Sequence, residues 1–565
     1  MRVLGINAVF HDPAAALVVD GQIVAAAEEE RFNRRKHGKP NVAFSAWEVP
    51  ELSAAWCLRQ AGLRPQDLDA VAYSFDPGLC APASELGLDD VWDHLRVDYA
   101  RRAPGFLATA LPGLEPSIVR FVPHHVAHAA SAVLAGPYRS SASLVLDGRG
   151  ERASHLSSHW VDGECTPLAA QGLPHSLGLL YEDLTAHLGF HRSSDEYKVM
   201  ALASYGTPRH LADFSELVRT TDDGGFVTET IDWAAYAPQG TGELSQVHAD
   251  LAATVQKRLE QVLLELARWL HDRTGERHLT MAGGTALNCV ANSVLLREGP
   301  FDDIWIQPAA GDAGTALGAA LQVAREHEPL GPPMVSAALG RGFTDDDLEL
   351  ALRTARVPFE RPDDLAAEVA DHLAANHVIA WFQGRAEYGP RALGHRSLLA
   401  HPGLASNLEL LNDIKGREQF RPVAPLVLLE RAAEIFDGKV PSPYMLFVHQ
   451  VADAWRKRIP AVVHVDGTAR AQTVDRATQP LLASVLDAFE ARTGLPVLVN
   501  TSLNTAGRPI VDSPTDVLEL FGSAPVDVLV LGPFVVRRAD LATPPEHDAR
   551  AGTVDLTEAG ERVPA

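Results

Sequence analysis

Three histidines stand within five positions of the chain, in the stretch FVPHHVAHAA at residues 121–130. If the following residues form a helix, His124 and His128 project from one face with Cβ atoms about 5–6 Å apart. Both imidazoles could then reach one metal ion, whereas His125 would point elsewhere. By itself this spacing indicates a pair of satisfied polar histidines as readily as a pair of metal ligands.

Two aspartates beside glycines are candidates for the remaining ligands. Asp147 and Asp312 each lie at the predicted end of a strand, where a carboxylate can project into a cleft. Either one alone is equally consistent with a turn residue or a helix N-cap. A mixed set of imidazoles and carboxylates suits Fe(II), although Mn and Zn would also fit.

Two strand–glycine–helix units indicate a nucleotide site. Gly283 and Gly284 precede a predicted helix, with Asn288 on the following turn, and Gly311, Asp312 and Gly314 repeat this pattern. A glycine turn admits a ligand close to the backbone, and a helix N-terminus favours anionic oxygens. One such turn is usually only a turn, but two together favour nucleotide binding.

The C-terminal half carries basic side chains on glycine-rich segments. They occur in WFQGRAEYGPRALGHRSLLAHP, DIKGREQFRPVAP and DGTARAQ, and the stretch LPVLVNTSLN follows them. Arginines in such segments suit phosphates, which they can bind through paired hydrogen bonds. A solvated basic face is the alternative, and it is weakened because these arginines lie inside apolar, proline-bounded segments of an acidic chain.

The elements that position these residues form a repeated pattern. A β-hairpin layout occurs around residues 1–30 and again around residues 142–170, which suggests two related lobes facing each other across a cleft. A long amphipathic helix is predicted over residues 253–275. Prolines and charges near residues 325–362 indicate a boundary. We therefore predict domains at 1–345 and 360–540, followed by a mobile tail at 541–565.

Composition limits the classes of function. The 565 residues have 46% hydrophobic content and a formal net charge of -24, which fits a soluble protein and argues against a nucleic-acid surface. No apolar run approaches the roughly 18–20 residues that a membrane span needs. Four scattered cysteines without CxxC spacing fit a reducing cytoplasm rather than a disulfide framework. Cytoplasmic localisation is therefore expected.

Nearly the whole chain resembles one family, the O-carbamoyltransferases of the nodulation-factor, cephalosporin, novobiocin and tobramycin type. The resemblance rests on motifs that occur in the family's order. They are GINAVFHDPAAALVVDGQIVAAAEEERFNRRKH, HHVAHAA, SLGLLYEDLT, DEYKVMALASYG, GGTALNCVAN, QGRAEYGPRALGHRS, KGREQFRPVAP and NTSLN. Each motif alone is unspecific, but the combination is highly specific.

The resemblance implies an α/β protein with two parts. The N-terminal domain would be similar to the universal tRNA-threonylcarbamoyl transferase, with the two-lobed actin/sugar-kinase fold. The C-terminal domain would be similar to YrdC-type carbamoyl-adenylate synthases. In the N-terminal domain the family binds Fe(II), and the matching ligands are His124, His128, Asp147 and Asp312. Family members form dimers, so a homodimer is an expectation.

The implied reaction has two steps. ATP, with Mg²⁺, and carbamoyl phosphate would give carbamoyl adenylate in the C-terminal domain. The carbamoyl group would then move, in the N-terminal domain, to a hydroxyl of a small natural product, in antibiotic biosynthesis. The residues that match the ATP and carbamoyl phosphate site are Arg391, Lys415, Arg421, Arg470, Asn500 and Ser502. Those that match the carbamoyl-adenylate site are Asp147, Gly178, Gly284 and Asn288.

The roles of His11 and of the acceptor segment stay open. His11 matches the family's N-terminal histidine and is the candidate general base, with orientation of Asp12 or of the acceptor as the alternative. Residues 78–118 match no motif, and the aspartates there could bind acceptor ammonium groups or form a solvated helix face. These aspartates are Asp89, Asp90, Asp93 and Asp98. The acceptor could be an aminoglycoside, a cephem, a macrolactam or an oligosaccharide.

Other classes of function also fit part of the sequence. A sugar kinase of the same N-terminal fold would leave His124, His128 and the second domain unexplained. A tRNA-modifying transferase would share the chemistry, but an acidic chain suits RNA poorly. A non-enzymatic ATP-binding regulator would not need a metal beside the nucleotide.

Overall fold

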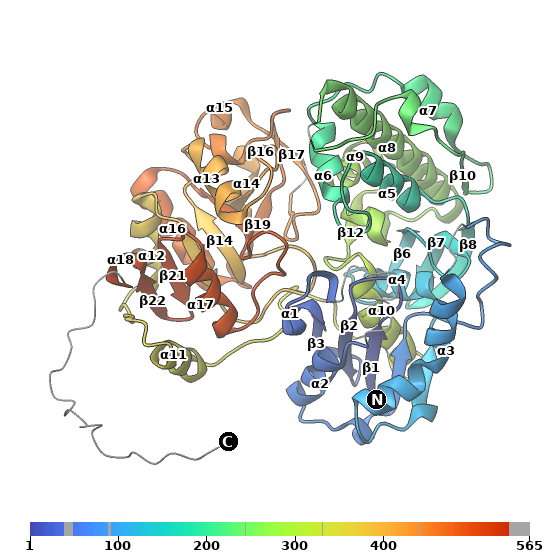
Figure 1. Cartoon of the computed structure of the whole chain (residues 1–565), viewed down its shortest axis with the longest axis horizontal. Helices are drawn as coiled ribbons and strands as arrows, with labels where there is room; N and C mark the ends of the chain where they lie inside the picture. The colour runs from blue at the N-terminus through green and yellow to red at the C-terminus, as the bar shows by residue number, and fades with distance from the viewer. Residues whose placement is uncertain (39–48, 89–91, 243, 330, 439, 542–565) are drawn as a thin grey trace, which may run out of the picture.

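The computed structural model describes residues 1–38, 49–88, 92–242, 244–329, 331–438 and 440–541. Figure 1 shows two N-terminal lobes, coloured blue to green, beside a C-terminal domain coloured orange to red. The tail predicted at 541–565 lies, apart from Leu541, outside the described residues.

The first lobe is built on a five-stranded sheet of order β3-β2-β1-β4-β5. Its strands are β1 (Arg2–Asn7), β2 (Ala14–Val19), β3 (Gln22–Glu28), β4 (Ala70–Tyr73) and β5 (Val119–Phe121). Strands β1, β2 and β3 are antiparallel neighbours, whereas β4 and β5 continue the sheet in parallel. The Asp20-Gly21 turn therefore closes the predicted hairpin.

The second lobe repeats this topology strand for strand. Its sheet has the order β12-β11-β6-β7-β8, with β6, β7 and β8 antiparallel and β11 and β12 parallel. The strands are β6 (Ser140–Leu146), β7 (Ala153–Val161), β8 (Glu164–Gly172), β11 (His278–Ala282) and β12 (Asp303–Ile306). A duplicated sheet of this order is the two-lobed arrangement expected of the actin/sugar-kinase fold, so the predicted fold class is confirmed.

Two helices rich in small residues lie between the lobes. Helix α4 (His124–Val133) contacts the second sheet, helix α10 (Asp312–Arg325) contacts the first, and the two helices pack on each other. A Cβ at Gly318 of α10 would lie 1.8 Å from the Ala127 carbonyl oxygen of α4. Only glycine permits this approach, because any side chain would separate the helices. The close packing brings the first turns of α4 and α10 together.

The remaining described N-terminal helices surround these elements, and α8 matches the long amphipathic helix predicted over 253–275. They are α1 (Glu30–Asn33), α2 (Glu51–Gln60), α3 (Asp93–Ala110), α5 (Leu177–His187), α6 (Glu196–Ala203), α7 (Leu211–Leu217), α8 (Gln246–Thr274) and α9 (Cys289–Glu298). A short ribbon of β9 (Val218–Thr220) and β10 (Phe226–Thr228) packs nearby. The apolar stripe of α8 is buried in the core of the second lobe.

The C-terminal domain contains a mixed seven-stranded sheet of order β19-β15-β20-β14-β13-β21-β22. Its strands are β13 (Ile379–Phe382), β14 (Arg396–Ala400), β15 (Ala424–Leu428), β19 (Gln472–Val474), β20 (Val497–Ser502), β21 (Val528–Leu531) and β22 (Phe534–Arg537). A small sheet joins β16 (Phe436–Asp437), β17 (His449–Val451) and β18 (Thr468–Ala469). The accompanying helices are α11 (Asp345–Thr354), α12 (Leu365–Ala374), α13 (Ser406–Lys415), α14 (Leu429–Ile435), α15 (Asp453–Arg456), α16 (Pro480–Thr493), α17 (Pro514–Ser523) and α18 (Arg538–Leu541).

This sheet has its own continuous hydrophobic core, separate from the cores of the two lobes. A two-part α/β organisation follows, while the exact boundaries at 345 and 360 stay predictions. Among the described helices, none combines the length and apolarity needed to cross a bilayer.

Candidate functional site

Four predicted metal ligands converge between the lobes. The Nε2 atom of His124 lies 3.3 Å from Asp147 Oδ2 and 3.6 Å from Asp312 Oδ1. The Nε2 atom of His128 lies 3.7 Å and 3.6 Å from the same two oxygens. The four residues are at most 6% exposed. Two imidazoles and two carboxylates therefore face one small buried volume.

Local structure explains how each ligand reaches this point. Helix α4 begins at His124, whose backbone N–H donates to the buried carboxylate of Glu151 at 2.8 Å. One helical turn then places His128 on the same face. Asp147 follows the last residue of β6, and Asp312 is the first residue of α10. The sequence predicted a strand end for both aspartates. This is confirmed for Asp147 and wrong for Asp312, which stands at the start of a helix.

The donor set fits a divalent cation. His124 Nδ1 lies 3.2 Å from the Ser74 carbonyl oxygen, which fixes that nitrogen as the donor and leaves Nε2 as a lone-pair ligand. Among the described residues, neither nitrogen of His128 has a hydrogen-bond partner. A buried imidazole without partners is costly, and a cation among the two carboxylates would satisfy its Nε2 atom.

The electrostatics of the group agree with this arrangement. Burial alone would lower the pKa of His124, but the carboxylates of Asp147 and Asp312 raise that pKa well above its ordinary value. Burial would likewise raise the pKa of Asp147, yet His124 and His128 hold it well below the usual range. The two carboxylates are therefore ionised and attract positive charge, whether it comes from imidazolium or from a metal ion.

His125 is kept out of the group, although it is adjacent in sequence. It is buried and its pKa is lowered to about 3, mainly because burial disfavours the charged imidazolium. The residues whose ligand atoms converge are His124, His128, Asp147 and Asp312, without His125. The helical geometry that pairs positions 124 and 128 accounts for this difference.

His11 lies at the edge of the metal group. Its Nδ1 contacts Asp12 Oδ2 at 2.9 Å, and its Nε2 lies 3.9 Å from Asp312 Oδ2. Burial would lower the pKa of His11, but Asp312 and Asp12 raise it to about 10. A general base must be neutral, so this role requires that the charge of Asp312 be compensated. The geometry is compatible with either the base or the orienting role.

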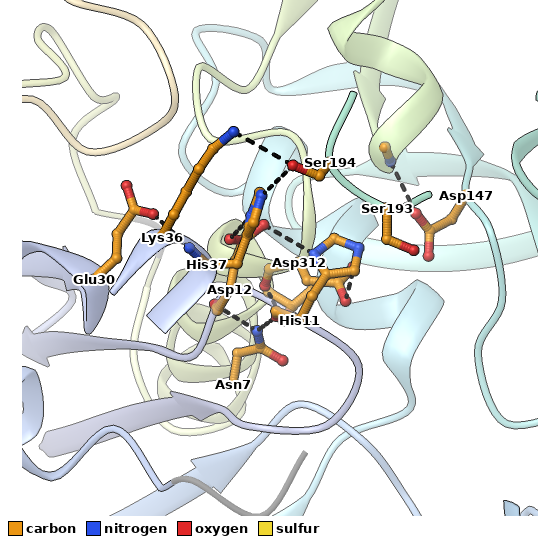
Figure 2. A network of polar contacts seen from close by, with 12 residues as sticks. Asn7, His11, Asp12, Glu30, Lys36, His37, Asp147, Ser193, Ser194 and Asp312 are labelled. Atoms are coloured by element: carbon orange, nitrogen blue, oxygen red, sulfur yellow. Dashed lines mark hydrogen bonds and ion pairs between the residues drawn. The ribbon is translucent and has the colours of Figure 1, made fainter. Parts of the chain in front are cut away.

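A polar network that the sequence did not reveal extends from His11. Figure 2 shows Asp12 between His11 and His37, with Ser194 beyond His37. Asp12 Oδ1 contacts His37 Nδ1 at 2.9 Å, and His37 Nε2 contacts Ser194 Oγ at 2.9 Å. Lys36 Nζ donates to the same hydroxyl at 3.3 Å. Lys36 and His37 belong to the motif NRRKH, but nothing in the local sequence indicated which residues they contact.

The predicted carbamoyl-adenylate residues line the second lobe beside the metal group. The backbone N–H of Gly284 donates to Asp147 Oδ1 at 2.9 Å. A Cβ at Gly178 would lie 2.7 Å from the Asp147 carbonyl oxygen, so only glycine fits at the start of α5. Asn288 caps α9 by accepting from the Ala291 N–H at 3.0 Å. The amide of Asn288 also pairs with Gln256, at 2.8 Å and 3.2 Å.

In the C-terminal domain, Lys415 is the last residue of α13, and its side chain reaches the end of β20. The residue is 4% exposed, and its ammonium donates to Ser502 Oγ at 3.1 Å and to Asn504 Oδ1 at 2.6 Å. The carbonyl oxygens of Ser502 and Asn504 also accept from it. Burial, with Arg417 and then Arg421 nearby, lowers the pKa of Lys415 well below its ordinary value.

Arg417 and Arg421 lie near this ammonium, and further guanidinium groups lie near those two. Burial, Arg470 and other neighbours lower the pKa of Arg391 to about 9, and burial with Arg421 and Arg470 lowers that of Arg417 to about 9. Arginines keep their protons at neutral pH, so these shifts reflect the burial of charged groups together with repulsion from neighbouring cations. In the described part of the chain, the buried Nε atoms of Arg391 and Arg470 have no hydrogen-bond partner. This arrangement is suited to a polyanion.

Asn500 and Ser502 support the basic cluster from β20. Asn500 Nδ2 donates to the Ala392 carbonyl oxygen at 3.1 Å and to Gln472 Oε1 at 2.6 Å. Ser502 Oγ donates to Asn504 Oδ1 at 2.7 Å. Asn500 therefore holds the segment that carries Arg391, whereas Ser502 holds the segment that carries Lys415.

The basic cluster faces the N-terminal domain across a pocket. Lys198 of α6 pairs with Glu418 at 2.8 Å, and the Arg421 guanidinium lies 4.6 Å from the ring centre of Tyr197. The pocket is lined from the N-terminal side by Met200, Tyr205 and Cys289 and from the C-terminal side by residues that include Phe420 and Arg470. Tyr197 and Lys198 lie in the motif DEYKVMALASYG, but sequence reasoning gave them no role.

Of the aspartates proposed for ammonium binding, the structure describes Asp93 and Asp98, and arginines lie beside both. Asp93 pairs with Arg96 at 2.7 Å and with Arg149 at 2.6 Å, so cations of the chain already neutralise it. Asp98 is exposed and lies 3.7 Å from both Arg101 and Arg102. Asp98 therefore lies on a solvated helix face, whereas Asp93 is buried and paired with arginines of the chain. Asp89 and Asp90 lie outside the described residues.

Comparison with known proteins identifies related sequences over most of the chain. The model of the carbamoyltransferase N-terminus matches residues 2–80 and 91–321, and that of the carbamoyltransferase C-terminus matches residues 370–538. Nodulation protein NolNO of Sinorhizobium fredii is 39% identical over 94% of this chain and 80% of its own length. Nodulation protein U of Rhizobium tropici is 31% identical over 90% of this chain and 92% of its own length.

Two solved structures that match are distant from this chain in sequence and in shape. The ROK hexokinase of Thermus thermophilus covers 57% of this chain and 98% of its own, at 16% identity and a TM-score of 0.29. HypF of T. kodakarensis covers 57% of this chain and 47% of its own, at 15% identity and a TM-score of 0.33. At such scores the fold assignment rests on the strand order described above.

Proposed function

The chain belongs to the carbamoyltransferase family, and from this premise we propose that it is an ATP-dependent O-carbamoyltransferase with two separate sites. The first site would make carbamoyl adenylate from carbamoyl phosphate and ATP. The second would transfer the carbamoyl group to a hydroxyl of a small molecule. The observation that carries this proposal is the presence, in one chain, of a buried cation-binding group and a separate cluster of buried cations.

The basic cluster supports the adenylate-forming step. Net hydrolysis of carbamoyl phosphate gives carbamate and phosphate, and attack of the carbamate oxygen on the α-phosphorus of ATP then gives carbamoyl adenylate and releases pyrophosphate. Lys415, Arg391 and Arg470 would bind the phosphate oxygens, whose negative charge relieves the repulsion among these cations. Arg421, Asn500 and Ser502 would hold the remaining groups, and ATP would bring Mg²⁺.

The N-terminal site supports the transfer step. His124, His128, Asp147 and Asp312 would hold a divalent ion, which we propose is Fe(II). When bound, such an ion acts as a Lewis acid toward a carbonyl oxygen. Gly178 lets the start of α5 pack on the Asp147 backbone, Gly284 donates its N–H to the Asp147 carboxylate, and a nucleotide would bind beside these backbone segments. Asn288 would contribute mainly by capping α9, since its amide is already paired.

The acceptor hydroxyl must lose a proton as it attacks the carbamoyl carbon. The oxygen–carbon bond of the carbamate ester forms, the bond to the phosphate oxygen breaks, and AMP leaves. His11 is placed to accept the proton, because Asp12 holds its Nδ1 atom and its Nε2 atom faces the site. The alternative, in which His11 only orients the acceptor, predicts a smaller loss for His11→Asn.

The reaction is tested by exchange of labelled pyrophosphate into ATP. Carbamoyl adenylate formation requires exchange that depends on carbamoyl phosphate. Product analysis with Fe(II) and a panel of hydroxylated acceptors should then give AMP, pyrophosphate and a carbamoylated acceptor. ADP with a phosphorylated acceptor would instead establish a kinase. Nucleotide binding without turnover of either kind would indicate a regulator.

A further inference from the structure

One loop of the C-terminal domain reaches the helix that carries a metal-group aspartate. We call residues 387–396 the linking loop. At its start, the buried Tyr388 hydroxyl donates to the carbonyl oxygen of Ala313, the residue after Asp312 in α10. A Cβ at Gly389 would lie 2.7 Å from the Pro308 carbonyl oxygen, in the segment just before α10. Tyr388 and Gly389, which we call the tip of the linking loop, therefore contact the chain on both sides of Asp312.

The N-terminal domain holds this tip through a buried ion pair. Glu28 Oε1 accepts the Gly389 N–H at 2.6 Å, and the Arg31 guanidinium donates to the Gly389 carbonyl oxygen at 2.9 Å. Glu28 and Arg31 lie 3.5 Å apart, and neither is more than 6% exposed. Buried charges are costly unless they are paired and hydrogen-bonded. The Glu28 and Arg31 side chains therefore keep fixed positions against each other and against the Gly389 backbone. The tip is anchored rather than merely adjacent.

The other end of the linking loop belongs to the basic cluster. Arg391 lies two residues beyond Gly389, and the Ala392 carbonyl oxygen accepts from Asn500. The loop is closed by Glu387, whose Oε1 atom accepts the N–H groups of Leu393, His395 and Arg396 at 2.7, 2.9 and 3.1 Å. These three bonds hold the two ends of the loop together.

We propose that Tyr388 is a positioning residue for the metal group. Through the Ala313 carbonyl oxygen it fixes the first turn of α10, and therefore Asp312, relative to the C-terminal domain. Tyr388 touches neither substrate nor metal, so it acts through Asp312. The geometry of the N-terminal site thus depends on a side chain from the domain that carries the basic cluster. This inference rests on the metal site proposed above.

The test compares Tyr388→Phe with the wild type in the full-length protein. Co(II) serves as the probe, because its visible spectrum reports the geometry of its ligands. Loss of the hydroxyl should weaken Co(II) binding by about tenfold, as is usual for groups that orient metal ligands, and should change the intensity of the visible bands. Carbamoyl-phosphate-dependent pyrophosphate exchange should be unchanged, because Arg391 and Lys415 stay in place.

Tyr73→Phe is the matched control. Tyr73 is also fully buried, and its hydroxyl has no hydrogen-bond partner within the described chain, so its removal should leave Co(II) binding unchanged. Gly389→Ala provides a second variant, because its Cβ would press on Pro308 and the backbone has a φ of +116°. It should weaken Co(II) binding as Tyr388→Phe does.

The outcomes separate this inference from the proposed function. A Tyr388→Phe protein with wild-type affinity and spectrum would overturn the inference, including when Gly389→Ala alone has an effect. If Tyr73→Phe weakens Co(II) binding equally, the inference is overturned as well. The effect would then follow from the loss of any buried tyrosine hydroxyl and not from the contact with Ala313. If the wild type itself binds no Co(II), the proposed metal site fails first.

Discussion

The two candidate sites hold buried charge in opposite ways. In the N-terminal group, two carboxylates face two imidazoles, and each side supports the charge of the other. In the C-terminal cluster, burial lowers the pKa of Lys415, Arg391 and Arg417, and nearby guanidinium groups lower it further. In the first arrangement the two carboxylates favour positive charge, which protonated histidines supply here and which a bound cation would also supply. The second is stabilised only when an anion arrives, so it should bind phosphates strongly and respond to pH.

The largest expected effect comes from removing one carboxylate of the N-terminal group. Asp312→Asn keeps the side-chain size but removes the charge, so metal binding should weaken by more than about 100-fold, the upper figure for groups that only orient ligands. Transfer to an acceptor should be lost, while pyrophosphate exchange should persist. Metal titration and exchange assays check this. Asp98→Asn, at an exposed position, is the control.

The next largest effect should come from removing one charge of the C-terminal cluster. Lys415→Met removes one buried ammonium, and a hydrogen bond to a charged group contributes about 1.5–3 kcal/mol, which corresponds to about 10–150-fold. Pyrophosphate exchange should fall by this factor while metal affinity is unchanged. Lys457→Met, in an exposed part of the same domain, should have no effect. Equal loss of both properties would contradict the separation of the two sites.

The lowered pKa of Lys415 predicts a pH dependence. The ammonium binds phosphate oxygens and the neutral amine does not, so pyrophosphate affinity should fall as pH rises through this pKa. The fall begins well below the ordinary lysine value of 10.5 and approaches about tenfold per pH unit for one proton. Calorimetric titration between neutral and alkaline pH measures it. A Lys415→Met protein with the same pH profile would refute the assignment.

The smallest effect should come from the histidine outside the metal group. His125→Gln should leave metal affinity unchanged and lower the free energy of unfolding by about 1 kcal/mol, a typical cost for a buried substitution. His128→Gln, three positions on, should instead abolish tight metal binding. Similar metal affinities in the two variants would mean that the ligand assignment along α4 is wrong.

Local sequence patterns indicated candidates for the N-terminal site, and the family resemblance selected them as a set. The HxxxH spacing places two histidines on one helical face, and Asp147 at a strand end and Asp312 at a helix start converge on them. The repeated hairpins predicted the two lobes because strand order follows from such local units. Asn288 shows the limit of this reasoning. The sequence assigned Asn288 to adenylate binding. In the structure its amide caps α9 and pairs with Gln256, contacts that the local pattern did not reveal.

Contacts between the domains could not be predicted. Tyr388 is 75 positions from Ala313, and Gly389 is 361 positions from Glu28. No periodicity or spacing relates residues so far apart, because their contact depends on how complete domains pack. The motif EYGPRALGHR suggested phosphate binding through its arginines, and the tyrosine and glycine in it carried no local signal of a partner. The His37–Ser194 contact was missed for the same reason.

The most direct test of two separate sites compares three proteins in one assay. The wild type, Asp312→Asn and Lys415→Met are supplied with ATP, Mg²⁺ and labelled pyrophosphate, with and without carbamoyl phosphate. Our account predicts carbamoyl-phosphate-dependent exchange in the wild type and in Asp312→Asn, and a strong loss in Lys415→Met. Exchange that is absent from the wild type, independent of carbamoyl phosphate, or lost in Asp312→Asn would contradict it.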